Sequence, residues 1–258
     1  MKNCDVLEKS KGVLIFANNT GYIDYTTIAA RAQTLAEHYL KLPVTIVTGQ
    51  DFANKRYNID SGNFEAWHNG GRYLAYELSP YDQTILIDSD YFVFDDNLLK
   101  ILDVVNDYQI TKTNNYVCSQ HSNQMGQYSL DTLWATVIVF NKTPKTRMLF
   151  DLVGVIERNY QYYRDLYNIE ARNFRNDYAF TIADNIINGY CPNQENYLPW
   201  PIVSVPGPID SLELKDFKFY LKTSGQALVL PKQSIHLMSK AWLLSDSCKQ
   251  LIEAATNA

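Results

Sequence analysis

The first ninety residues alternate between short apolar runs and longer segments with helical periodicity. The runs Gly12–Ala17, Pro43–Thr48 and Thr84–Asp88 are typical of strands that are buried on both faces. Residues 22–40 repeat apolar side chains every three or four positions, which predicts an amphipathic helix, and a shorter helix is expected at 71–78. This order of strand, helix, strand, helix and strand predicts a parallel α/β sheet that is covered by helices.

The second half of the chain carries a different mixture of patterns. Strands are expected at 116–119, 133–140 and 201–205, and helices at 146–167 and 177–187. We expect this half to complete the sheet and to form a wall beside its carboxyl edge, where sheets of this type bind their ligands.

Composition narrows the class of protein. The chain has 258 residues, of which 46% are hydrophobic and 20% are charged. This composition argues against wholesale disorder, and one domain over residues 1–258 is expected. The longest apolar runs are much shorter than the roughly 20 residues of a membrane-spanning helix. Residues 1–10 lack the apolar core of a secretion signal, so we expect a cytoplasmic protein. The four cysteines form no Cys-x-x-Cys pair, which argues against a zinc knuckle.

The net charge of −5 is unevenly placed. Residues 1–110 carry 9 Lys and Arg against 15 Asp and Glu, whereas residues 111–258 carry 14 against 13. An acidic domain binds nucleic acid poorly without a local basic patch, because that affinity comes from neutralised phosphates. Part of the negative excess is a group of carboxylates between Asp82 and Asp96, which suits a bound cation.

Two of those carboxylates, Asp88 and Asp90, flank Ser89 where the apolar run 84–88 ends. Residues i and i+2 of an extended chain point to the same side, so both carboxylates can converge on one hard cation. Mg²⁺ and Mn²⁺ prefer oxygen ligands and bridge phosphate oxygens. Aspartate is also common in ordinary turns, but the position at the carboxyl end of a buried strand favours a divalent-cation site.

Three segments together resemble one family of enzymes. Gly12–Tyr22 is similar to an opening strand with a nucleoside-binding loop, Thr84–Phe94 to a strand bearing an Asp-x-Asp motif, and Ser234–Trp242 to a C-terminal His and Lys motif. The layout resembles GT-A-fold, nucleotide-sugar-dependent glycosyltransferases, and among them glycosyltransferase family 8, which includes glycogenin. The resemblance implies an α/β fold with a Rossmann-like mixed sheet flanked by helices. It further implies a nucleotide-binding half at 1–110 and an acceptor-side half at 111–258.

The same resemblance implies a set of metal and catalytic residues. Asp88, Asp90 and His236 would hold Mn²⁺ or Mg²⁺, and Lys240 would bind the diphosphate of the donor, expected to be a UDP-sugar. A cation and a lysine at that place stabilise the negative charge that builds on the departing diphosphate. Asp90 and Lys240 therefore join Asp177 as the expected catalytic residues. The family resemblance also favours transfer with retention of the anomeric configuration.

On the nucleotide side, the resemblance points to Asn18, Asn19 and Tyr22, to Arg72 on the helix before the metal strand, and to Ser89. The two asparagines have a simpler interpretation, because Asn is common in the turn that follows a strand. The tyrosine would contribute an aromatic face to the nucleoside.

Asp177 stands at the start of a predicted helix, where members of the family carry a carboxylate that faces the sugar. There it could bind sugar hydroxyls or stabilise positive charge at the anomeric carbon. Aspartate is also favoured at helix N-termini for purely structural reasons. Arg175 is a candidate contact for phosphate or acceptor, His121 for acceptor, and Trp134 is either a sugar platform or part of the core.

Three other functions remain open on the sequence. A haloacid-dehalogenase-type phosphatase also uses Asp-x-Asp, with the first aspartate as nucleophile. In that family Gly and then Thr or Val follow the second aspartate, whereas Tyr91 and Phe92 occupy those positions here. A sugar nucleotidyltransferase would carry a glycine-rich loop after the first strand. A non-catalytic carbohydrate-binding protein could retain the same fold.

The acceptor is open between a glycan, a protein and a hydroxymethylated base in DNA. The last would suit a bacteriophage enzyme, and two groups of basic residues in the second half are candidate phosphate contacts. The first group comprises Lys142, Lys145 and Arg147, and the second comprises Lys215, Lys218 and Lys222.

Overall fold

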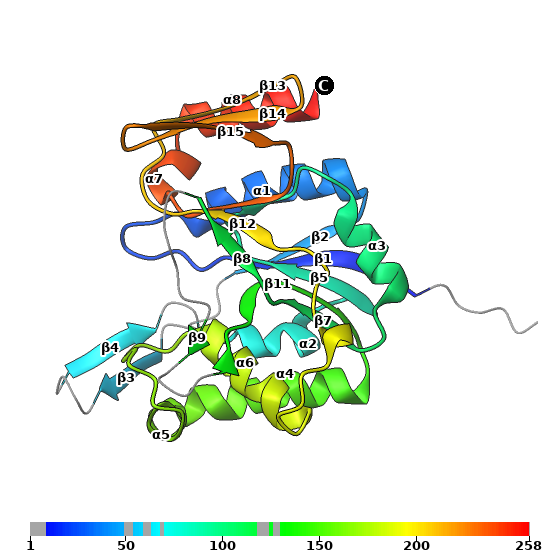
Figure 1. Ribbon diagram of the computed structural model, residues 1–258, viewed down its shortest axis with the longest axis vertical. Helices are drawn as coiled ribbons and strands as arrows, with labels where there is room; N and C mark the ends of the chain where they lie inside the picture. The colour runs from blue at the N-terminus through cyan, green and yellow to red at the C-terminus, as the bar shows by residue number, and fades with distance from the viewer. Residues whose placement is uncertain are drawn as a thin grey trace, which may run out of the picture.

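The computed structural model shows a layered α/β molecule (Figure 1). It describes residues 9–48, 54–58, 63–67, 70–117, 124–125 and 130–257, with the backbone alone for 54–58 and 63–67. Within the described residues, helices are either too short or too polar to cross a membrane.

A five-stranded mixed sheet forms the centre, in the order β2-β1-β5-β11-β7. Its strands are β1 (Lys11–Phe16), β2 (Val44–Val47), β5 (Gln83–Ile87), β7 (Tyr108–Thr111) and β11 (Trp134–Asn141). The first three are parallel, as the sequence predicts, and β11 runs antiparallel to both of its neighbours. The predicted α/β class with a mixed sheet flanked by helices is confirmed.

Helices cover both faces of this sheet. In Figure 1, α1 (Tyr25–Leu40) lies above the sheet, and α2 (Ala75–Leu78), α4 (Pro144–Arg158) and α6 (Asn176–Ile187) lie below it. Alternate side chains of β1 enter separate cores, because successive strand residues point to opposite faces. Val13 and Ile15 pack with α1 residues, whereas Leu14 packs with residues of α4 and α6.

A second sheet extends from the carboxyl end of β5. Its order is β6-β16-β12-β8, and its strands are β6 (Tyr91–Phe92), β8 (Asn114–Tyr116), β12 (Ile202–Val205) and β16 (Ile235–Leu237). The pairing of β6 with β16 places His236 opposite Tyr91. Segments from opposite halves of the chain therefore meet beside the central sheet.

A third, antiparallel sheet lies beyond α1 in Figure 1. It consists of β13 (Ser211–Lys215), β14 (Lys218–Thr223) and β15 (Gln226–Pro231), and β13 packs against α8 (Asp246–Thr256). The remaining elements are α3 (Asn97–Val104), α5 (Tyr160–Leu166), α7 (Lys240–Leu243), β3 (Asn54–Asn58), β4 (Asn63–Trp67), β9 (Gln124–Met125), β10 (Leu130–Asp131) and the short 3₁₀ helices at Arg72–Leu74 and Gln194–Asn196.

Several predicted boundaries differ from the structure. The helix expected at 71–78 is a 3₁₀ helix at Arg72–Leu74 followed by the short helix α2. The first helix begins at Tyr25 rather than at residue 22, because the Asp24 side chain accepts the Thr27 backbone N–H and caps the helix there. The long helix at 146–167 is two helices, α4 and α5, separated at Asn159, whose φ of −120° leaves the helical region. The strand expected at 116–119 ends at Tyr116, and residues 118–119 lie outside the described residues.

Gly12 permits a close approach of the Tyr81 ring to β1. A Cβ at residue 12 would lie 2.3 Å from that ring, and the Tyr81 hydroxyl is hydrogen-bonded to Thr45 Oγ1 at 2.8 Å.

We predict that Gly12→Ala lowers the free energy of unfolding by about 1–3 kcal/mol, because the Tyr81 ring must move. Urea denaturation measures this, with Gly21→Ala as the control, since nothing lies within 4 Å of a Cβ at that position. Equal stability of the two variants would contradict the prediction.

Candidate functional site

The site begins where β5 ends. The Asp88 N–H still donates to Thr136 O of β11 at 3.0 Å, but the next residues leave the sheet in a turn closed by the Tyr91 N–H and Asp88 O, 3.1 Å apart. Asp90 O then accepts the Leu237 N–H at 2.9 Å, which joins this turn to β16. The backbone therefore holds both carboxylates at the junction of two sheets.

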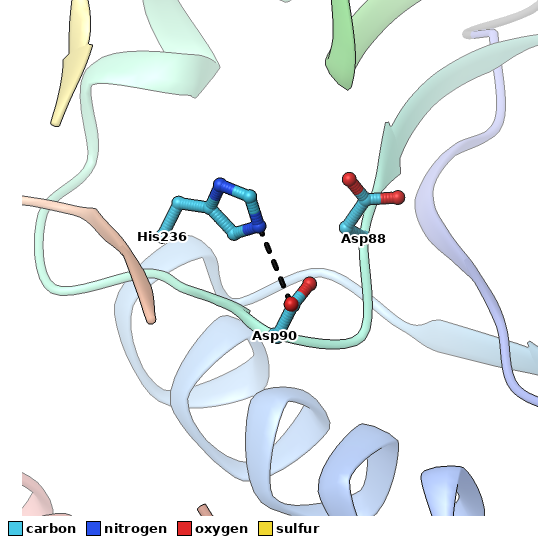
Figure 2. Close-up of side chains that lie close together, drawn as sticks. All are labelled: Asp88, Asp90 and His236. Atoms are coloured by element: carbon cyan, nitrogen blue, oxygen red, sulfur yellow. Dashed lines mark ion pairs between the residues drawn. The ribbon is translucent and has the colours of Figure 1, made fainter. Parts of the chain in front are cut away.

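Asp88, Asp90 and His236 converge at this junction. Each offers one ligand atom, and the three atoms lie within 4.8 Å of one another. Figure 2 shows the His236 ring directed at Asp90, with His236 Nε2 and Asp90 Oδ2 3.3 Å apart, and the Asp88 carboxylate facing the same space from the end of β5. Two carboxylate oxygens and an imidazole nitrogen are a donor set that suits a divalent metal ion such as Mn²⁺.

Ser204, which is not among the residues that the sequence predicts, orients the histidine. It lies on β12 directly beside His236 of β16, and its Oγ is 3.0 Å from His236 Nδ1. A partner on Nδ1 fixes the ring orientation and leaves Nε2 directed toward the carboxylates. No sequence signal could have found Ser204, because its role comes from the register between strands that are distant in the chain.

Two side-chain nitrogens lie beside Asp90. Its Oδ2 is contacted by both Lys240 Nζ and His236 Nε2. Burial alone would raise the pKa of Asp90, but His236 and Lys240 outweigh it and hold the pKa well below its usual range. Burial likewise opposes the charged form of His236, yet the Asp90 carboxylate raises the pKa of that imidazole. The arrangement therefore keeps Asp90 ionised, as a metal ligand must be. The raised pKa of His236 favours its protonated form, so a metal ion that binds Nε2 must displace that proton.

Asp88 has a different partner. Arg72 Nη1 lies 2.7 Å from Asp88 Oδ1, and Arg72 Nη2 donates to Ala135 O at 2.5 Å. Burial raises the pKa of Asp88, and Arg72 opposes that rise. The Arg72 residue is only 6% exposed, and its Nε has no hydrogen-bond partner among the described residues. Arg72 thus ties the end of β5 to the start of β11 and keeps one donor group unused.

A cavity of about 260 Å³ opens over these residues. Its wall includes the polar side chains of Asp88, Asp90 and His236 and the aromatic side chains of Tyr25, Tyr116 and Trp134. The lining residues are Phe16, Asn18, Tyr25, Gly70, Arg72, Asp88, Ser89, Asp90, Tyr116, Trp134, Ala135, Thr136, Arg175, Asn176, Asp177, His236, Met238 and Lys240.

Asp177 reaches the cavity from the first turn of α6. Its Oδ1 accepts the Ala135 N–H at 2.9 Å, and its Oδ2 pairs with Arg175 Nη2 at 2.8 Å. Ala135 thus connects two charged centres of the cavity, because its carbonyl binds Arg72 and its N–H binds Asp177. Two hydrogen bonds thus hold the Asp177 carboxylate in the wall of the cavity that Asp88, Asp90 and His236 also line.

The structure brings most of the expected site residues into one cavity. Asn18, Arg72, Asp88, Ser89, Asp90, Asp177, His236 and Lys240 all line it. Asn19 and Tyr22 do not: Asn19 Oδ1 accepts the Thr26 N–H at 2.9 Å within the loop before α1, and Tyr22 is 98% exposed. A nucleotide-binding role for those two residues stays a prediction, and His121 lies outside the described residues.

The two groups of basic residues have different surroundings. Lys142 Nζ donates to Ser79 O at 2.7 Å, Lys145 lies over the Tyr108 ring, and Arg147 pairs with two exposed carboxylates. The second group, Lys215, Lys218 and Lys222, is exposed on β13 and β14.

Comparison with known proteins finds similarity only among solved structures. No protein-family model matches the chain, and no curated sequence matches it. The glycosyltransferase GlyE of Streptococcus pneumoniae TIGR4 matches 73% of this chain at 12% identity and a TM-score of 0.39, and the chain spans 44% of GlyE. Mouse xyloside xylosyltransferase 1 matches 70% of this chain and 83% of its own at 10% identity and a TM-score of 0.38. The galactosyltransferase LgtC matches 67% of this chain and 69% of its own at 13% identity and a TM-score of 0.41. Similarity at this level does not by itself assign a function.

Arg72 supplies a test of the site's construction. We predict that Arg72→Met lowers the free energy of unfolding by about 1–3 kcal/mol, because Asp88 and Ala135 O both lose a buried donor. Arg72→Lys should lose less, since an ammonium can still pair with Asp88 but lacks the second fixed donor. Chemical denaturation measures both, with the exposed Arg147→Met as control, whose stability should stay close to that of the wild type. A fully stable Arg72→Met variant would show that the contact contributes nothing.

Proposed function

We propose that this chain is a metal-dependent glycosyltransferase that moves a sugar from a nucleoside-diphosphate sugar to an acceptor hydroxyl. The observation that carries the proposal is the convergence of Asp88, Asp90 and His236 in one cavity that also contains Arg72 and Lys240. Carboxylates and imidazole bind a divalent cation, and the two cationic side chains complement the remaining charge of a diphosphate.

The three ligand side chains fit Mn²⁺ or Mg²⁺. They come from two sheets joined by backbone hydrogen bonds, they line the same cavity, and Ser204 holds the imidazole in place. A bound divalent ion would supply positive charge against the donor diphosphate without any proton transfer. Ser89, between the two carboxylates, lines the same cavity, and we expect it to contact the diphosphate or the ribose.

Asn18 and Arg72 both contribute polar side chains to the lining of the cavity. Asn18 lies beyond the carboxyl end of β1, at the edge where sheets of this type bind their ligands. We assign the nucleoside to the Asn18 side, with UDP as the expected nucleotide.

The reaction breaks the bond between the anomeric carbon and the diphosphate oxygen and forms a bond from the acceptor oxygen to the same carbon. Lys240 holds its ammonium at the diphosphate and balances the charge that builds there. Asp177 faces the sugar, where its fixed carboxylate binds hydroxyls and stabilises positive charge at the anomeric carbon. The acceptor proton leaves with the diphosphate or to water. We take retention of configuration from the family resemblance.

Tyr116 provides the acceptor side of the cavity with an aromatic wall. Its ring lies 5.7 Å from that of Trp134, and Trp134 itself is only 3% exposed. The more accessible tyrosine is therefore the surface on which a sugar ring can stack, and the tryptophan supports it from behind.

Nucleotide and metal binding test the proposal. We expect Mn²⁺ with UDP, at a hundredfold excess over Kd, to raise the melting temperature by roughly 5–10 °C. Asp90→Asn should abolish the metal-dependent part of the shift, because a neutral amide is a poor ligand for a hard cation. Asp103→Asn, a matched change of an exposed carboxylate on α3, should leave it intact. If no nucleoside diphosphate stabilises the wild type in a metal-dependent manner, the proposed function is wrong.

Lys240 supplies a second test, with effects of opposite sign on two ligands. Its ammonium contacts the same Asp90 carboxylate that would bind the metal ion. We predict that Lys240→Met binds Mn²⁺ alone more tightly, because a competing cation is removed, and binds UDP in the presence of Mn²⁺ about tenfold more weakly, because a charge-assisted contact is lost. Isothermal titration calorimetry measures both affinities. Weaker binding of both ligands would indicate that Lys240 only supports the local structure.

A further inference from the structure

The sheet β13-β14-β15 has one buried and one exposed face. On β14 the burial alternates strictly, with Phe219, Leu221 and Thr223 buried and the residues between them exposed. The inner face joins the core, where the Phe219 ring meets that of Phe94 at 4.9 Å in an edge-to-face contact. The outer face has no packing role of this kind, so the identity of its side chains calls for another explanation.

Strand register defines the composition of that outer face. Residues directly opposite one another in an antiparallel sheet point to the same side, so three rows can be read across β13, β14 and β15. The rows are Ser211, Lys222 and Ala227; Glu213, Tyr220 and Val229; and Lys215, Lys218 and Pro231. Lysines thus flank a central row with two apolar side chains, in which Val229 is 56% exposed and Tyr220 is 40% exposed.

The turn between β13 and β14 carries the most exposed apolar side chain of this sheet. Asp216 and Phe217 connect the strands as a two-residue loop, and φ is positive at both, at 49° and 58°. Such loops favour Asn and Gly, and a bulky residue with positive φ is an outlier that costs stability. Phe217 is nevertheless 81% exposed. The positive φ at Phe217 therefore lowers the stability of the turn, and burial of the ring does not offset this loss.

Like charges gather around the same turn. Lys215 and Lys218 are directly opposite each other, which destabilises a sheet, and Lys232 Nζ lies 5.8 Å from the centre of the Phe217 ring. Glu213 pairs with Lys215, whereas Lys218 and Lys222 are exposed and have no ion-pair partner among the described residues. The four lysines of this surface, Lys215, Lys218, Lys222 and Lys232, outnumber its two carboxylates, Glu213 and Asp216, by two. The surface is therefore positive in a protein whose net charge is −5.

We propose that this outer face, with Phe217 at its tip, docks the protein on an anionic lipid membrane surface. Phe217 would enter the boundary between headgroups and acyl chains, Tyr220 and Val229 would lie against the interface, and the lysines would pair with anionic headgroups. One apolar anchor alone binds a membrane weakly, and a set of basic residues beside it supplies the second attraction.

The side chains on this face favour a lipid surface over nucleic acid. Its apolar members include Val229 and Pro231, which have no π-face for stacking on bases. Arginine, the usual reader of guanine edges, is absent from β13, β14 and β15. A lipid interface accommodates both the aliphatic and the aromatic side chains, with lysine ammonium groups at headgroup level.

Vesicle co-sedimentation of the full chain tests the proposal. We expect binding in low salt to vesicles of phosphatidylcholine and phosphatidylglycerol mixed at a molar ratio of about two to one, weaker binding in high salt, and little binding to pure phosphatidylcholine.

Lys218→Gln and Lys222→Gln should each weaken binding to these anionic vesicles about fivefold. Phe217→Gly should weaken it about tenfold, and yet keep or raise the melting temperature, because Asp followed by Gly suits a loop with positive φ. Loss of binding with equal or greater stability separates docking from a structural role.

Lys249→Gln is the matched control, since Lys249 is an exposed lysine of α8 that faces Glu253, and it should bind vesicles as the wild type does. The shift in melting temperature caused by Mn²⁺ and UDP should persist in every variant, so a failure of the docking proposal is distinguishable from a failure of the proposed function. If the wild-type protein does not bind anionic vesicles in low salt, the proposal is overturned. The proposal is also overturned if the lysine variants lose binding to a short DNA duplex while their binding to vesicles stays unchanged.

Discussion

The pairing of β6 with β16 is the constraint on which the candidate site depends. It joins the turn after β5 to a strand near the other end of the chain, and the hydrogen bond from the Leu237 N–H to Asp90 O extends the connection. This backbone ladder, rather than any contact between side chains, places His236 beside Asp90. Ser204 then orients the imidazole from the neighbouring strand of the same sheet. The geometry of the proposed metal ligands is therefore a property of strand register.

Each carboxylate of the site is paired with a basic side chain. Asp90 is paired with His236 and Lys240, Asp88 with Arg72, and Asp177 with Arg175. Carboxylates that lose part of their hydration are costly unless they are paired. Asp90 is buried and the other two are half-buried, and each has a cationic partner that also lines the cavity. These same cations are suited to a diphosphate, so one set of side chains both stabilises the free protein and complements the proposed donor.

Much of the fold can be predicted from the sequence, for identifiable reasons. β1 and β5 are continuous apolar runs because they are buried on both faces, and α1 shows its apolar stripe because only one side of it meets the core. The sheet β13-β14-β15 does not follow from continuous apolar runs of this kind. Its strands are half exposed, and the place of β15 depends on its pairing with β14 more than on any run of apolar residues. The break at Asn159 is also not predicted, because the helical pattern continues across it.

The sequence by itself determined the class of fold, the carboxylate pair Asp88 and Asp90, and the position of that pair at the end of a buried strand, because these features are local patterns of side-chain spacing. Only the tertiary structure decided that Asn18 and Asp177 share the cavity while Asn19 and Tyr22 do not, that Ser204 supports His236, and that the lysines of β13 and β14 surround an exposed Phe217. Those relations come from strand pairing and helix packing between distant segments, which local spacing does not encode.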